Sequence, residues 1–226
     1  MERAARGRRS TSYGALLVIG LAAVSIAPTA ATSGRAARSA RELRDQVLRG
    51  RHVVIEHDCG GCHGGGSSPA VEGWLAGVRT PDMEFQVGSF KTRPRNLTPD
   101  NATGLGRFSE RQIFNALRYG LRPEDTPDVE ITSSVPGQGN FPLNPHYLAV
   151  PMPWPAFRHM PDEDIRAVAA YLKHGLKPVA NRVLDSEGPP DFWASEYTPE
   201  KIGTYPASAF PAVNEAAPKQ PGGATR

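Results

Sequence analysis

The sequence predicts an all-α domain of three to five helices, joined by long loops and followed by an extended C-terminal tail. Apolar residues recur at helical spacing in three segments, and each segment has a capping or stop signal. Between these segments the chain is rich in proline and glycine (22 and 23 residues), which favour loops. The hydrophobic fraction of 39% is below the usual globular share, so the folded part is expected to be short and supported by a cofactor.

The N-terminus, residues 1–31, is predicted to be a secretory signal peptide. Four arginines precede an apolar run at 13–27, and the small residues at 28–31 suit cleavage. The run is shorter than the roughly 20 residues of a membrane span, so an uncleaved membrane anchor is the less favoured alternative. In both cases the domain that follows is expected to be periplasmic or otherwise extracytoplasmic.

The charge of the chain does not predict a nucleic-acid partner. The formal net charge is +3, and residues 1–31 contribute four Arg and one Glu, which leaves the rest near neutral. The remaining arginines between positions 35 and 51 are expected to form a solvated arm or helix face, because a nucleic-acid-binding domain needs a strong basic patch.

Residues 32–45 are expected to be a lead-in and the start of the first helix, and residues 46–182 to form the domain. Ser39 and Glu42 match a capping box at the start of that helix. The apolar pattern continues across Gly50, although a glycine within a helix costs about 1 kcal/mol relative to alanine. A close approach by another helix would explain this glycine.

Residues 64–94 are expected to be loop, with a short strand near 83–87. A further helix is predicted to begin after Ser109, which forms a capping box with Gln112, and to end at Gly120.

A long irregular loop follows at 121–150. The last helix is predicted to open at Pro161, because proline is tolerated in a first helical turn and the three acidic residues that follow suit the helix dipole. It is predicted to stop at Gly175. Residues 183–226 are expected to be an extended tail rich in Pro and Ala, whose aromatic residues pack on the domain or on a partner. Plain disorder is the alternative for this tail.

The strongest chemical signal is Cys-Gly-Gly-Cys-His at residues 59–63, which contains both cysteines of the chain. Cys-x-x-Cys-His is the attachment signature of c-type haem. Cys59 and Cys62 can each add to a vinyl group on one edge of a porphyrin, and His63 can then bind the iron. The two intervening glycines are expected to leave room for the macrocycle. The sequence therefore predicts one covalent haem c with its iron.

Three other interpretations of this motif are less favoured. A structural zinc site usually needs four protein ligands, and the chain has no second cysteine pair. A thioredoxin-like redox pair needs a βαβ setting, which the flanking sequence lacks. A disulfide within so short a loop would be strained and would stabilise little.

Several further motifs occur in order. They are Asn-Leu-Thr-Pro-Asp at 96–100, Thr-Gly-Leu-Gly at 103–106, Met-Pro-Trp at 152–154 and Met-Pro-Asp-Glu-Asp-Ile at 160–165. Together with the haem motif, they resemble the class I cytochrome c domains of the cytochrome subunits of membrane-bound alcohol and aldehyde dehydrogenases. The resemblance covers about residues 46–180 and implies a class I cytochrome c fold around one haem. Those subunits usually carry several haem motifs, whereas this chain has one.

The resemblance also implies that Gly50 contacts the last helix near Tyr171 or Leu172. It matches Met152 to the family's sixth iron ligand. A thioether is a soft ligand that favours Fe(II) and raises the potential. His146 and His159 are the alternative ligands.

Arg93, Arg95 and Asn96 are candidates for contacts with the haem propionates, and Trp154 for packing on the haem. Surface positions next to Pro94 are the alternative for the arginines.

The predicted function is one-electron transfer, without substrate chemistry of its own. The expected partner is a redox protein: a periplasmic or membrane-attached dehydrogenase, a terminal oxidase or another cytochrome. The alternatives are a free soluble carrier, and a haem enzyme or gas sensor in which the sixth iron position is open.

Overall fold

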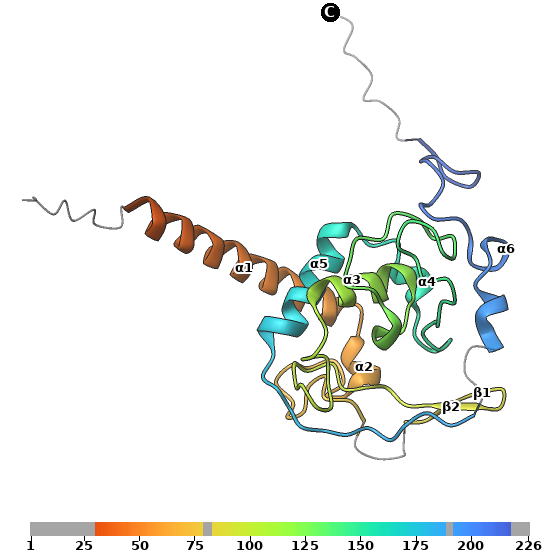
Figure 1. Cartoon of the computed structure of the whole chain (residues 1–226), viewed down its shortest axis with the longest axis horizontal. Helices are drawn as coiled ribbons and strands as arrows, with labels where there is room; N and C mark the ends of the chain where they lie inside the picture. Colours follow the sequence, from red (N-terminus) through yellow and green to blue (C-terminus); the bar gives the residue numbers. More distant parts are fainter. Residues whose placement is uncertain (1–29, 79–82, 189–191, 218–226) are drawn as a thin grey trace, which may run out of the picture. The chain divides into compact units, whose positions relative to one another are not determined.

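A computed structural model of the chain describes residues 30–78, 83–188 and 192–217 (Figure 1). It divides into two compact units, residues 1–38 and 39–226. The predicted signal peptide lies outside the described residues, apart from Ala30 and Ala31, which are helical. Within the described ranges, no helix is long and apolar enough to cross a membrane.

The second unit is helix-rich, which confirms the predicted structural class, and it contains one small sheet. The α-helices in chain order are α1 (Ala30–Glu56), α2 (Cys59–His63), α3 (Glu110–Tyr119), α4 (Trp154–Phe157), α5 (Asp162–Ala170) and α6 (Pro199–Ile202). The described residues also form two short 3-10 helices, η1 (Pro123–Asp125) and η3 (Phe192–Glu196), and a π-helical turn, η2 (Tyr171–Gly175), that extends α5.

The sheet is an antiparallel hairpin of β1 (Phe85–Val87) and β2 (Phe90–Thr92), in which Phe85 lies opposite Thr92 and Val87 opposite Phe90. It overlaps the short strand expected near residues 83–87.

Helix α1 begins earlier than the sequence predicted. Residues 32–38, expected to be a lead-in, are helical, and Ser39 lies inside the helix instead of capping it. The segment 30–37 contains four alanines, which have the highest helix propensity. The capping pattern at Ser39 was therefore not sufficient to mark the start of the helix.

Helix α3 has the predicted boundaries. Its capping box is present, because the Ser109 hydroxyl accepts from the Gln112 amide at 3.1 Å and the Gln112 side chain accepts from the Ser109 amide at 3.0 Å. Gly120 ends the helix in the left-handed region at φ 69°. The apolar face of α3 packs against α5, and the two helices run side by side in Figure 1.

Gly50 marks a close approach between α1 and α5 with its extension η2, the helix that the sequence predicted it to contact. A Cβ atom at Gly50 would overlap the carbonyl of Ala167 and would lie 2.8 Å from the Cβ of Tyr171. Next to it, Arg49 pairs with Asp164 at 2.5 Å and with Glu163 at 2.8 Å. The two helices therefore approach through backbone at one position and are linked by ion pairs beside it.

The main core lies around this crossing. It contains apolar side chains from α1, α3, α5 and the 74–108 loops, namely Val53, Val54, Trp74, Leu75, Leu105, Phe108, Ile113, Val168, Ala169, Tyr171 and Leu172. Inside the core, the indole N–H of Trp74 donates to the Tyr171 hydroxyl at 3.0 Å. This bond connects the loop after α2 to η2, the turn that extends α5.

The segment 121–150 is irregular, as expected, with η1 and an isolated pairing of Leu121 with Tyr147. Part of the chain after residue 182 packs on the rest of the unit: Val183 is buried, and Glu187 pairs with Lys91 of β2, whereas residues 203–211 are exposed. Trp193 is 1% exposed, and its ring centroid lies 4.8 Å from that of Phe90.

Replacing Gly50 by alanine tests the helix crossing. In an open helix this change adds about 1 kcal/mol of stability. Here we expect a loss of about 1–3 kcal/mol, because the new methyl group overlaps the Ala167 carbonyl. Denaturant unfolding of the haem-loaded protein measures the change. Arg51→Ala is the control, since Arg51 is the exposed neighbour on the same helix. Equal effects of the two substitutions would contradict the crossing.

Candidate haem site

The motif at 59–63 forms a separate short helix, α2, directly after α1. Asp58, in the left-handed region at φ 47°, turns the chain between the two helices. Two segments hold the end of α2: the Leu75 amide donates to the Gly64 carbonyl at 2.9 Å, and the Gly77 amide donates to the His63 carbonyl at 2.7 Å. The backbone that carries the two thiols and the imidazole is therefore fixed by the core loops.

The imidazole of His63 has the orientation expected of an iron ligand. Its Nδ1 atom donates a hydrogen bond of 2.7 Å to the carbonyl oxygen of Arg95. A carbonyl only accepts, so Nδ1 carries the proton and Nε2 keeps a lone pair for a metal. Burial lowers the pKa of His63, while the hydrogen bond to Arg95 opposes this. The neutral form, which is the one that binds metal, is favoured at neutral pH.

Both cysteines are free thiols, so the alternative disulfide is not formed. Cys59 packs against the main core, and this burial raises the pKa of its thiol to about 11. Cys62 is exposed. In the described part of the chain, no group of three or more His, Cys, Asp or Glu side chains could hold a metal ion. Two unpaired thiols and an oriented imidazole on one helix fit the attachment of a c-type haem.

In the structure, a side chain at either glycine of the motif would meet protein groups. A Cβ at Gly60 would overlap the indole ring of Trp74 and the carbonyl of Gly66. A Cβ at Gly61 would meet the carboxylate of Asp58, a side chain that can move. Gly60 therefore lets α2 lie directly on Trp74.

The three candidates for propionate contacts already have partners within the chain. Arg93 is buried and bonds to Glu84, to Glu187 at 2.8 Å and to the carbonyl of Asp185 at 2.6 Å. Such carboxylate partners neutralise the guanidinium charge that a propionate would need.

The amide of Asn96 is also satisfied. It donates to the Val179 carbonyl at 2.8 Å and accepts from the Thr98 amide and hydroxyl at 2.9 and 2.8 Å. Arg95 makes longer bonds of 3.3 Å, to the Leu184 carbonyl and to Asp185.

Met152 is half-buried in a tight turn between Ala149 and Trp154. The Met152 amide donates to the Ala149 carbonyl at 2.9 Å, and the Trp154 amide donates to the Met152 carbonyl at 2.8 Å. Trp154 is buried and stacks on Tyr147, with ring centroids 6.1 Å apart. A Cβ at Gly120 would overlap the Trp154 ring, so this ring also packs on the end of α3.

The other candidate ligands have different surroundings. Met160 packs against the main core, shortly before α5. The ring centroid of His159 lies 5.6 Å from that of Tyr205, and His146 lies 4.0 Å from the Asp125 carboxylate.

Sequence reasoning missed three side chains around the site. Trp74 packs on α2, and Arg158 and Tyr197 hold the segment around Met152. A tryptophan within the Gly- and Ser-rich segment after the motif was a recognisable core candidate. No pattern distinguished Arg158 or Tyr197, because their partners are backbone carbonyls distant in sequence.

Comparison with known proteins supports the resemblance seen in the sequence. The chain is 29% identical over 134 residues to the cytochrome c subunit of the quinone alcohol dehydrogenase of Gluconacetobacter polyoxogenes, which is 59% of this chain and 23% of that subunit. It is 29% identical over 143 residues to the gluconate 2-dehydrogenase cytochrome c subunit of Pantoea cypripedii, covering 63% and 26% of the two chains.

The fructose dehydrogenase cytochrome subunit of Gluconobacter japonicus is 27% identical over 136 residues, which is 60% of this chain and 22% of that subunit. The matched part of this chain thus spans about a quarter of the length of these relatives. No model of a known protein family matches the chain. The relatives confirm the resemblance to a cytochrome c domain.

A pair of alanine substitutions tests how α2 is seated. We expect Gly60→Ala to lower the stability of the haem-loaded protein by about 1–3 kcal/mol, because a methyl group there meets the Trp74 ring and backbone. Gly61→Ala is the matched control and should cost less, since the Asp58 carboxylate can rotate away. Denaturant unfolding measures both. A larger loss for Gly61→Ala would show that Trp74 does not support α2.

Proposed function

We propose that this protein is a monohaem c-type cytochrome with the class I fold, and that it transfers one electron at a time. Cys59 and Cys62 would form the thioether bonds, and His63 and Met152 would be the axial ligands of the iron. The observation that carries this proposal is the orientation of His63, whose Nδ1–H···O bond to Arg95 leaves Nε2 available next to two free thiols.

Each of these residues has a defined task. When bound, haem supplies a one-electron iron couple. The Arg95 carbonyl fixes the tautomer and the plane of the His63 ring and makes the ring a stronger donor. The Met152 sulfur would favour the reduced iron because it is a soft ligand. With two protein ligands on the metal, no position is left for a substrate, which suits electron transfer and not catalysis by this chain.

Of the three residues considered for propionates, Arg95 is the one we retain. Its guanidinium is half-exposed, and its bonds to the chain are long, at 3.3–3.4 Å. The buried guanidinium of Arg93 and the amide of Asn96 instead hold the segments 84–93 and 96–103 against the chain after α5.

We further propose that the protein accepts electrons from a dehydrogenase, as a subunit or as a partner, outside the cytoplasm. The relatives named above are cytochrome subunits of alcohol, gluconate and fructose dehydrogenases. The predicted signal peptide at 1–31 supports the extracytoplasmic location.

The haem ligands are tested by mass and by spectrum. The intact mass of the mature chain should show one added haem, and two reactive thiols in haem-loaded protein would contradict this.

Met152→Ala should keep the haem but lower the reduction potential and open the iron to carbon monoxide, because the soft ligand is lost. Met160→Ala is the control, since Met160 packs in the core. If Met160→Ala alone opens the iron, the ligand assignment is wrong.

The partner is tested by gentle purification of the native protein. We expect a dehydrogenase to accompany it, and the haem to be reduced when the substrate of that enzyme is added. The variant Met152→Ala should slow this reduction, because its lower potential removes driving force. A protein that purifies alone and exchanges electrons equally well with unrelated redox proteins would be a free carrier. A reduced protein that binds carbon monoxide without any substitution would instead have an open iron.

A further inference from the structure

The segment 193–205 crosses the chain on both sides of Met152, and we call it the strap. It follows the segment that pairs with β2 and contains most of η3 together with α6 (Figure 1). Its first residue, Trp193, is anchored on Phe90. Most of its other contacts reach residues 147–159, the stretch that contains the proposed sixth ligand.

Before Met152, the strap acts through Tyr197. The Tyr197 hydroxyl donates a hydrogen bond of 2.9 Å to the carbonyl of Leu148. The ring lies edge-on to two aromatic neighbours, with centroids 4.9 Å from Trp154 and 5.3 Å from Tyr147. One strap residue therefore contacts the chain four residues before Met152 and two residues after it.

After Met152, the connection is made by Arg158, which is 7% exposed. Its Nη2 atom donates to the carbonyls of Ile202 and Gly203, both at 2.8 Å. Its Nε atom donates to the Pro155 carbonyl at 3.2 Å. Hydrogen bonds from a charged donor to carbonyls are stronger than neutral ones, and burial excludes the water that would compete with them.

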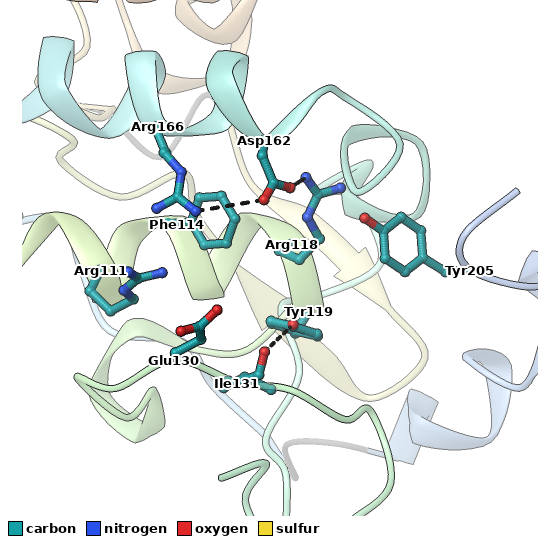
Figure 2. A pocket seen from close by; sticks show the side chains of 9 residues that line it. All are labelled: Arg111, Phe114, Arg118, Tyr119, Glu130, Ile131, Asp162, Arg166 and Tyr205. Atoms are coloured by element: carbon teal, nitrogen blue, oxygen red, sulfur yellow. Dashed lines mark hydrogen bonds and ion pairs between the residues drawn. The ribbon is translucent and has the colours of Figure 1, made fainter. Parts of the chain in front are cut away.

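The end of the strap meets α3 and the residue that ends α4. Tyr205 lies over two arginines, with its ring centroid 5.1 Å from the guanidinium carbon of Arg118 and 5.8 Å from that of Arg158. Figure 2 shows Arg118 between Tyr205 and Asp162, the first residue of α5. Arg118 also donates to the carbonyls of Arg158 and Met160. The Met152 segment is thus held from α3 on one side and from the strap on the other.

The Met152 turn itself has little support of its own. Its backbone hydrogen bonds connect neighbouring residues, from Met152 to Ala149 and from Trp154 to Met152. Such local bonds do not fix the turn relative to α2. The contacts that restrain it lie at its two ends. On the side of α3, the Leu148 amide donates to the Gly120 carbonyl at 2.7 Å and the Trp154 ring packs on Gly120. On the side of the strap, they are those of Tyr197 and Arg158.

We infer that the strap is a positioning element for the sixth iron ligand, and that Tyr197 and Arg158 are its positioning residues. The inference rests on the proposed function, because it takes Met152 as the ligand. A thioether is a weak neutral ligand, so the fraction of time that it stays on the iron depends on how closely the turn is held. Loosening either end of the turn should increase dissociation of the sulfur while leaving the attachment at Cys59 and Cys62 intact.

The test uses the full-length, haem-loaded protein and two substitutions, Tyr197→Phe and Arg158→Lys. Tyr197→Phe keeps the ring but removes the hydrogen bond to Leu148, and Arg158→Lys keeps the charge but cannot reach all the carbonyls. The readouts are the weak far-red band of a sulfur-ligated oxidised iron and the rate at which carbon monoxide replaces the ligand. Loss of one hydrogen bond should raise that rate about fivefold.

Tyr119→Phe is the matched control. The Tyr119 hydroxyl also donates to a backbone carbonyl, that of Ile131 at 2.8 Å (Figure 2), and neither residue belongs to the strap or to the Met152 turn. The stability cost should be similar, whereas the rate of replacement should change by less than about twofold. A purely structural effect would move the rate in all three variants together.

The outcomes separate the two proposals. A far-red band in the unsubstituted protein that weakens in Tyr197→Phe and Arg158→Lys, but not in Tyr119→Phe, supports the strap. A normal band with unchanged rates in both strap variants overturns the strap alone. If the unsubstituted protein has no such band, Met152 is not the ligand, and both the proposed ligation and the strap are wrong.

Discussion

The contact between the backbones of α1 and α5 at Gly50 is the constraint on which the haem motif depends. Because no Cβ intervenes, Tyr171 lies against α1, and its hydroxyl accepts the N–H of Trp74. The indole of Trp74 in turn occupies the space next to Gly60 in α2. Two glycines and one hydrogen bond thus connect the helix crossing to the backbone that carries the cysteines.

The imidazole depends on a different part of the chain. His63 is oriented by the carbonyl of Arg95, and the Leu97 amide donates to the Leu75 carbonyl at 2.8 Å in the same region. Asn96 binds this segment to Val179 through a side-chain amide that is 2% exposed. The chain after α5 therefore supports the proximal side of the site, and the strap supports the segment that carries Met152.

Parts of this arrangement follow from local patterns. The capping box of Ser109 and the left-handed Gly120 define α3 as the sequence predicted, since both signals act within one helical turn. The predicted start of α1 was wrong, because the alanine-rich sequence before Ser39 is already helical despite the capping pattern there. The contact of Gly60 with Trp74 was not predicted, since Trp74 comes from a loop whose path no local pattern determines.

The sequence by itself predicted the proposed chemistry: two thiols, an imidazole and a thioether, in an order that resembles a cytochrome c domain. The proposed covalent attachment would depend on residues that are adjacent in the chain, so their spacing alone predicts it. Only the tertiary structure decided which groups orient these ligands. The partner of His63 is a backbone carbonyl 32 residues away, and the groups that hold the Met152 turn are a tyrosine hydroxyl and the carbonyls of residues 202 and 203. Every residue has a carbonyl, so no residue type signals that role, and only the path of the folded chain selects the one that is used.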